Sequence, residues 1–223
     1  MIQAMVSLAG GQDLQPARGW FETLGLSREG VFSGKIWQIF TYGLLHGGWL
    51  HAGANSLLIL LIGSRIEHMA GSRAMVKALA GGVLGGGVGH LLLAAGGDGA
   101  PLLVGSSGGC LALLLLLTTL SPQSRMMPLP ISGRSLGLGI LAMELLTALV
   151  DPAMKIPGLS DIGDRLVDKG LGSAFDMGHA CHFGGGVAGW ALGRWLLRPR
   201  VTLERLRRDR ERREAGGSER NGS

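Results

Sequence analysis

The chain has 223 residues, of which 46% are hydrophobic, 17% are charged and 40 are glycine, and its formal net charge is +5. Charged residues are fewer than the about 25% of a typical soluble domain, and glycine far exceeds its usual share. Two cysteines cannot build a disulfide framework. These values exclude a disordered chain and a disulfide-stapled secreted module, and they favour a membrane protein.

The N-terminal segment 1–12 carries no charge, but it is short for a membrane span. Twelve helical residues reach only about 18 Å, against about 30 Å for the hydrocarbon core. The segment also lacks the basic region of a signal peptide. We therefore expect a first helix that is short or truncated.

Five further segments are apolar enough to suggest helices across a membrane. In chain order they are 36–64, with its helix beginning near His51, then 78–97, 99–124, 135–150 and 177–193. Within the third, residues 107–120 make only about 21 Å of helix, so residues 101–106 are expected to enter the membrane region unwound, beside protein or water. The predicted fold is all-α and polytopic.

The last 26 residues hold nine Arg against five acidic residues, so the remaining chain carries only about +1. No basic stripe with interleaved aromatic residues occurs elsewhere, and nucleic acid is not an expected partner. We predict one transmembrane domain over residues 1–197 and a basic cytoplasmic tail over residues 198–223, which contacts anionic lipid.

The Lys and Arg residues also predict the orientation. Loops 65–77 and 121–134 together with the tail hold fourteen, against six in loops 1–35, 98–101 and 151–176. The first set is expected to face the cytoplasm, in a cell inner or plasma membrane. The helices that begin near His51, Ser107 and His182 then all start at the outer side, which brings three polar clusters to a similar depth.

These clusters contain residues suited to nucleophilic catalysis. His51 and Asn55 are four apart and share a helix face, where both can donate side-chain hydrogen bonds. Ser107 lies between glycines at a helix start, beside unpaired N–H groups that suit a developing oxyanion. Taken singly, each pattern is also typical of bonded polar groups or of a Gly-Ser loop.

His182 precedes a ridge of small residues at Gly185, Gly189 and Gly193. Such a ridge lets another helix pack closely, and the Ser107 helix is the expected partner. Close packing would bring His182 within the about 3 Å that a general base needs. The alternative is a plain packing seam with a buried histidine.

The order and spacing of these motifs resemble the rhomboid family of intramembrane serine proteases, from about Trp37 to Leu197. The matching motifs are His46, His51 and Asn55; Gly63, Glu67 and Gly71; Gly105-Ser106-Ser107-Gly108; and His182, Gly185 and Gly189. The resemblance implies a six-helix core, a Ser107–His182 dyad with no aspartate as a third member, and an oxyanion site formed by the Ser107 N–H with His51 and Asn55. It assigns His46 to loop positioning.

The resemblance also implies substrates: transmembrane helical proteins that are cleaved in the lipid bilayer near its outer face, without a cofactor. The sequence identifies no substrate-binding residues. Two positions depart from the family, since Gln38 replaces an Arg after Trp37 and Leu111 replaces an aromatic residue that packs on the histidine.

Other polar residues of the spans receive structural interpretations. Glu144 is expected to face protein or water, and His90 and His179 are expected to pack or to line cavities. No spacing of His, Cys and acidic residues suggests a metal.

Two alternatives stay open. One is a catalytically impaired rhomboid-like protein that binds membrane clients, which the departures at Gln38 and Leu111 allow. The other is a soluble α/β-hydrolase, because residues 105–109 also fit Gly-x-Ser-x-Gly and Ser107, Asp161 and His182 follow its chain order.

Overall fold

The computed structural model describes residues 15–94, 102–125 and 130–199, and a few positions of the tail (204, 206–208 and 210). The chain divides into two compact units, Met1–Gly193 and Arg194–Ser223. The first unit holds nearly all of the described residues. The short helix predicted over residues 1–12 lies outside the described residues, as does most of the predicted tail.

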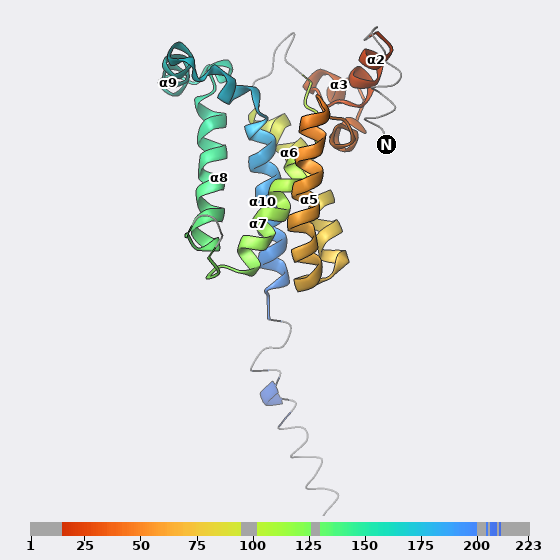
Figure 1. The fold of residues 1–223 in the computed structure, drawn as a ribbon, viewed down its shortest axis with the longest axis vertical. Helices are drawn as coiled ribbons and strands as arrows, with labels where there is room; N and C mark the ends of the chain where they lie inside the picture. The colour runs from red at the N-terminus through yellow and green to blue at the C-terminus, as the bar shows by residue number, and fades with distance from the viewer. Residues whose placement is uncertain are drawn as a thin grey trace, which may run out of the picture. The chain divides into compact units, whose positions relative to one another are not determined.

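Long helices form the body of this unit, and shorter helical segments connect them (Figure 1). The long helices are α5 (Trp49–Ala70), α6 (Ser72–Leu93), α7 (Ser107–Leu120), α8 (Gly133–Val150) and α10 (His179–Leu196). Before them lie α2 (Gln15–Leu24), α3 (Arg28–Phe32), α4 (Gln38–Thr41) and η1 (Tyr42–Leu44), and between α8 and α10 lie η2 (Pro152–Met154), α9 (Leu159–Leu166), η3 (Val167–Leu171) and η4 (Gly172–Asp176). Each of the five predicted apolar segments therefore contains a helix.

Three of the described helices are long and apolar enough to cross a membrane: α5, α6 and α8. Large apolar side chains project outward from them, among them Leu60 on α5 and Met143 on α8, which are 67% and 63% exposed. Apolar groups on the outside of a helix suit lipid rather than water. The predicted all-α, polytopic membrane fold is confirmed.

α7 and α10 differ from those three helices for separate reasons. α7 has only 14 residues, as predicted, and is mostly buried. α10 has 18 residues, but its glycines, two histidines and Arg194 lower its hydropathy. Of the five predicted spans, three contain a helix long and apolar enough to cross a membrane. The other two contain the short α7 and the less apolar α10.

Consecutive glycines place α10 at the centre of the unit. A Cβ atom at Gly184 would meet Gly85 of α6, one at Gly185 would meet Gly108 of α7, and one at Gly186 would meet the side chain of Leu141 of α8. Helices approach this closely only where side chains are small. The predicted packing of the α10 ridge on the Ser107 helix is confirmed.

The segment before α7 is unwound where the structure describes it, at Leu102–Ser106. Leu103 exchanges backbone hydrogen bonds of 2.9 and 3.0 Å with Leu26, and the Gly105 N–H donates to the Tyr42 carbonyl at 3.0 Å. Gly105 has φ +117°, which favours glycine. This segment carries the chain down to the start of α7.

The departure at Gln38 does not remove the anchor of the N-terminal segment. Gln38 is fully buried, its Nε2 donates to the Glu22 carbonyl at 3.1 Å, and its Oε1 accepts from the Ser27 N–H at 3.3 Å. The neighbouring Trp37 Nε1 donates to the Thr23 carbonyl at 2.9 Å. Gln38 therefore connects α4 to the chain around α2 and α3.

Candidate active site

Ser107 and His182 lie together, although 75 positions separate them in the sequence. The Ser107 hydroxyl is 2.9 Å from Nε2 of His182. Ser107 is the first residue of α7 and His182 lies in the first turn of α10, so both belong to the end of the bundle where these helices begin. The close approach of Gly185 to Gly108 holds the two helix starts at this distance.

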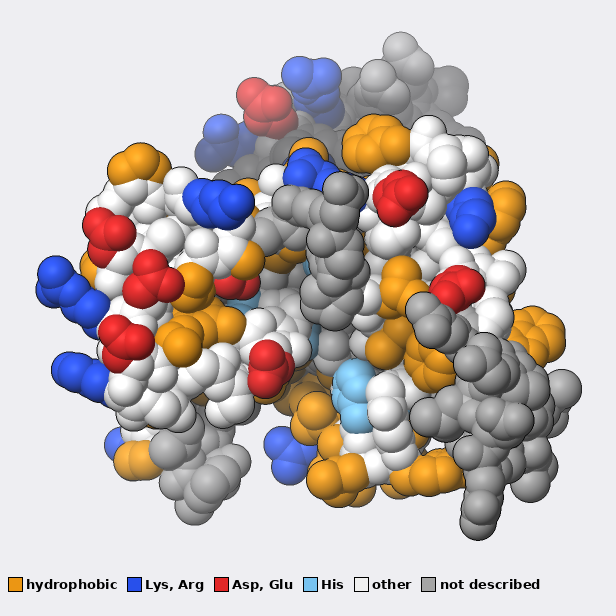
Figure 2. All heavy atoms as spheres, turned by 90° about the horizontal axis from the view of Figure 1, so that it is seen from above, with side chains coloured by type: hydrophobic (Ala, Val, Ile, Leu, Met, Phe, Trp, Pro, Cys, Tyr) orange, Lys and Arg blue, Asp and Glu red, His pale blue; other side chains and the backbone are white. Residues whose placement is uncertain are grey.

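Figure 2 views the unit from this end and shows histidine side chains among the loop residues, one in full view at the surface and others set deeper in a hollow. The His182 side chain is 13% exposed, and Ser107 is half-buried. The pair is therefore enclosed by protein without being sealed. A serine hydroxyl within hydrogen-bond distance of a histidine ring nitrogen, in a partly enclosed site, is the arrangement that activates serine as a nucleophile.

His51 and Asn55 of α5 face the unwound segment before Ser107. A Cβ atom at Gly105 would lie 2.9 Å from Nε2 of His51 and 3.6 Å from Nδ2 of Asn55. Gly105 thus admits both side chains to within a few ångströms of the chain two residues before Ser107. The structure brings together the residues that the sequence assigned to the nucleophile, the base and the oxyanion site.

In the side-chain amide of Asn55, the oxygen is bonded, whereas the nitrogen has no hydrogen-bond partner among the described residues. Cys110 of α7 donates from Sγ to the Asn55 carbonyl at 3.6 Å and to its Oδ1 at 3.7 Å. Asn55 is 4% exposed, and within the described part of the chain its Nδ2 has no hydrogen-bond partner. A buried donor without a partner is costly and calls for an explanation.

His46 lies outside the long helices, in the loop that leads to α5. Its Nε2 is 3.3 Å from the Ser106 hydroxyl, and its ring meets that of His51 edge-on at 5.1 Å. Burial, and then the neighbouring His51, lower the pKa of His46, so this imidazole is neutral at pH 7. These contacts fit the loop-positioning role that the sequence assigned to His46.

A carboxylate lies on the other side of His182, and the sequence reasoning missed it. Oε1 of Glu144 is 3.3 Å from Nδ1 of His182, and Oε2 is 2.6 Å from Nδ1 of His179. Glu144 was expected to face protein or water, and His179 to pack or to line a cavity; neither expectation included their contact with each other or that of Glu144 with His182. The contact depends on how α8 packs against α10, which no local pattern in either helix reveals.

A family model described as "Rhomboid domain" matches residues 33–199. The chain belongs to the rhomboid family. Over 70 residues it is 33% identical to the "Putative rhomboid protease YdcA" of Bacillus subtilis (strain 168), a match that covers 31% of the chain and 35% of that relative. The chain thus spans about a third of the length of the curated relative.

The rhomboid assignment disfavours the soluble α/β-hydrolase. The described residues contain two isolated β-bridges but no strand. Asp161, the acid which that alternative requires, is exposed on α9, while Glu144 lies beside His182.

Among the described residues, Glu144, His179 and His182 also form a set of side chains that resembles metal ligands. Their ligand atoms lie within 4.8 Å of one another. Nδ1 of His179 and Oε2 of Glu144 are 2.6 Å apart, which is the distance of a hydrogen bond with a proton between the two atoms. Carboxylate and imidazole groups in such contact can also act as proton donors and acceptors.

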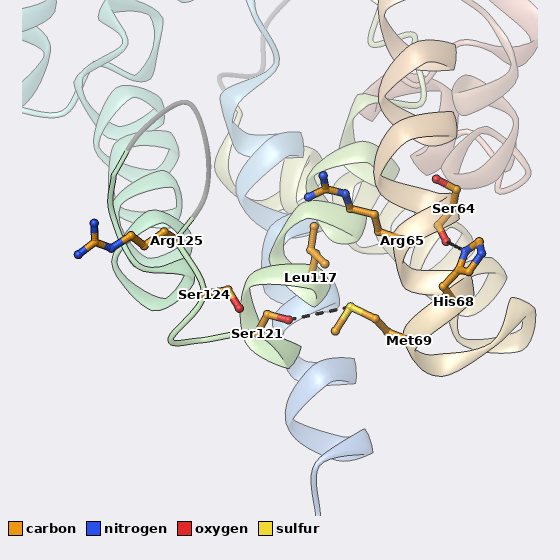
Figure 3. Close-up of a pocket in the computed structure, with 8 residues that line it drawn as sticks. All are labelled: Ser64, Arg65, His68, Met69, Leu117, Ser121, Ser124 and Arg125. Atoms are coloured by element: carbon orange, nitrogen blue, oxygen red, sulfur yellow. Dashed lines mark hydrogen bonds between the residues drawn. The ribbon is translucent and has the colours of Figure 1, made fainter.

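A cavity of about 450 Å³ lies far from Ser107, where α5 and α7 end (Figure 3). Arg65 points into it, whereas the guanidinium of Arg125 points away. Its lining residues are Ser64, Arg65, His68, Met69, Leu117, Ser121, Ser124 and Arg125. This cavity is separate from the Ser107 and His182 side chains.

Proposed function

We propose that this rhomboid is an intramembrane serine protease that uses a Ser107–His182 dyad. The distance of 2.9 Å between the Ser107 hydroxyl and His182 Nε2, inside a bundle of membrane helices, carries the proposal. Ser107 attacks the peptide carbonyl while His182 takes its proton. His182 then protonates the leaving amine, and water releases the acyl-enzyme.

Donors around Ser107 stabilise the oxyanion that forms during attack. The first N–H groups of a helix have no partner within that helix, so the start of α7 offers donors to a negative oxygen. His51 and Asn55 add side-chain donors from α5, and this role is supported by the Nδ2 of Asn55, which has no hydrogen-bond partner among the described residues. The oxyanion would supply a partner for that buried amide.

The substrates are transmembrane helical segments. The backbone hydrogen bonds of a helix shield its peptide bonds, so the substrate must unwind locally before Ser107 can reach a carbonyl. Segments with helix-breaking residues such as Gly or Pro lose least on unwinding. Cleavage would then take place near the membrane face at which α5, α7 and α10 begin.

That face is the outer one in the orientation we propose, with the protein in an inner or plasma membrane and the C-terminus in the cytoplasm. The fourteen Lys and Arg residues on one set of loops and the tail, against six on the other, support this orientation.

A reporter with a cleavable transmembrane segment tests the activity. In proteoliposomes, Ser107→Ala should abolish cleavage while membrane insertion remains. Ser106→Ala is the matched control, because it removes the adjacent hydroxyl and keeps the nucleophile, so cleavage should persist. Unchanged cleavage in Ser107→Ala would refute the assignment.

A fluorophosphonate probe distinguishes the protease from a client-binding protein. The probe should label the wild-type chain and fail to label Ser107→Ala. A wild-type chain that neither reacts with the probe nor cleaves any member of a panel of transmembrane segments, yet retains such segments on purification, would be a client-binding protein.

A further inference from the structure

Glu144 is an acidic side chain in the middle of α8, one of the helices long and apolar enough to cross a membrane. Its side chain is only 17% exposed. An ionisable group within a membrane helix is costly unless it pairs, and it is therefore a candidate for function. Its two oxygens reach two different imidazoles of α10.

One oxygen is fixed by a chain of contacts that does not involve Ser107. Glu144 Oε2 lies 2.6 Å from Nδ1 of His179, and Nε2 of His179 lies 2.6 Å from the Ala174 carbonyl in η4. Both nitrogens of the His179 ring thus face acceptors, and only the doubly protonated imidazole can donate to both. The carboxylate is then ionised and held in place from α10 and η4.

The other oxygen, Oε1, is free to face His182. It lies 3.3 Å from Nδ1 of that ring, while Nε2 of the same ring faces the Ser107 hydroxyl at 2.9 Å. An ionised oxygen can accept but not donate, so it favours the tautomer that carries its proton on Nδ1. That tautomer leaves the Nε2 lone pair free for the proton of Ser107. The contact is slightly long for a hydrogen bond, as such contacts often are before substrate binds.

We propose that Glu144 is a positioning residue that, held by His179, orients His182 and selects its reactive tautomer. The proposal rests on the proposed protease function and extends the dyad to a Ser-His-Glu arrangement. When the Ser107 oxygen forms its bond to the substrate carbon, its proton moves to Nε2 of His182. The resulting imidazolium keeps its Nδ1 proton directed at Glu144, which stays ionised. The Nε2 proton then goes to the departing amine as the carbon–nitrogen bond breaks.

The first test compares Glu144→Gln with Glu144→Asp in reporter cleavage. The Gln amide has no charge and can donate to Nδ1 of His182, which favours the wrong tautomer. We expect kcat to fall at least about tenfold with little change in KM, up to the about 10⁴-fold seen when a triad loses its carboxylate. Glu144→Asp restores the charge and should recover part of the loss. Thr147→Val is the matched control on α8: its hydroxyl is exposed and bonds Met143 of its own helix, so kcat should stay at the wild-type value.

The second test needs no variant of Glu144. ¹⁵N NMR of histidine-labelled protein, with His182 assigned by comparison with a His182→Gln sample, reports which ring nitrogen carries the proton. We expect the neutral His182 ring to carry it on Nδ1. A ring protonated on Nε2 alone would overturn the proposal even if Glu144→Gln fails to fold.

The outcomes separate this proposal from the proposed function. If the wild-type chain cleaves and Ser107→Ala does not, but Glu144→Gln matches the wild type in kcat, the positioning role is wrong and the protease stands. If the wild-type chain shows no cleavage or labelling that depends on Ser107, the protease proposal fails and the positioning role fails with it. If Glu144→Gln and Glu144→Asp lose melting temperature and kcat alike, with no rescue by Asp, Glu144 only holds α8 on α10 and the proposal is overturned.

Discussion

The amide of Asn55 is buried, yet within the described residues its nitrogen has no hydrogen-bond partner. A group kept in this state lowers stability, because its bonds to water are lost and not replaced. We propose that this amide binds the oxyanion that forms during peptide cleavage. Faster catalysis would then offset the loss of stability. Stability and activity should therefore respond differently to its removal.

Asn55→Ala should lower kcat by about 10²- to 10³-fold, the usual effect of losing one oxyanion donor. The melting temperature should change little, since the lost nitrogen has no partner among the described residues and the lost Oδ1 accepts a weak bond from Cys110 Sγ at 3.7 Å. Reporter cleavage and thermal unfolding in detergent measure the two effects. Ser56→Ala is the control: this exposed hydroxyl bonds its own helix, at the Ala52 carbonyl. Asn55→Ala with full activity and reduced stability would contradict the oxyanion role.

Residues of the site differed in how well the sequence predicted them. Ser107, His182, His51 and Asn55 stand in short patterns with a chemical meaning, and the structure places them close together. Glu144 stands alone in an apolar helix, and only the packing of α8 against α10 gives it a partner. The sequence predicted only that Glu144 faces protein or water, and which groups it contacts is a tertiary property.

At the scale of helices, α10 depends on glycine at positions where other helices touch its backbone. A Cβ atom at Gly189 would collide with the backbone of Ala112 in α7. The sequence predicted this seam because Gly185, Gly189 and Gly193 recur every four residues. It did not predict that α10 also packs on α6 and α8, because a ridge of small residues shows that a helix can approach closely but not which helix does.

Gly189→Ala should therefore destabilise the protein by about 3 kcal/mol, at the upper end of overpacking, since backbone rather than a flexible side chain must move. It should also lower cleavage, because α7 and α10 carry Ser107 and His182. Gly81→Ala in α6 is the matched control, since a Cβ atom there meets nothing within 4 Å, and its melting temperature should be unchanged or slightly raised. Thermal unfolding of both variants in one detergent measures the difference, and equal melting temperatures would contradict the close packing.

The N-terminal segment offers a second test at this scale. Gln38→Leu leaves backbone groups of Glu22 and Ser27 without their buried partner, which should cost about 1–3 kcal/mol. Because these bonds join α4 to the preceding chain, the loss should show as faster amide hydrogen exchange between residues 19 and 45. Thr23→Ser is a mild control, since only its backbone carbonyl takes part in these contacts. Exchange at the wild-type rate in Gln38→Leu would show that Gln38 is not the anchor.

At the scale of the molecule, α8 fixes which loops share a side of the membrane. It is one of the helices long and apolar enough to cross, so we expect the chain before it and the chain after it to lie on opposite sides. The Lys and Arg residues then decide which side is which, and they favour a cytoplasmic location for the chain before α8. The sequence predicts this orientation on its own, because it depends on the charge of the loops and not on how the helices pack.

Cysteine labelling tests both statements in intact cells. Ser124 precedes α8 and Lys169 follows it, and both are exposed, whereas the native Cys110 and Cys181 are buried and should give little background. A membrane-impermeant thiol reagent should label Lys169→Cys in intact cells and Ser124→Cys only after permeabilisation. The reverse pattern would invert the orientation and move the dyad toward the cytoplasmic face. Labelling of both positions in intact cells would mean that α8 does not cross, because an impermeant reagent reaches one side only.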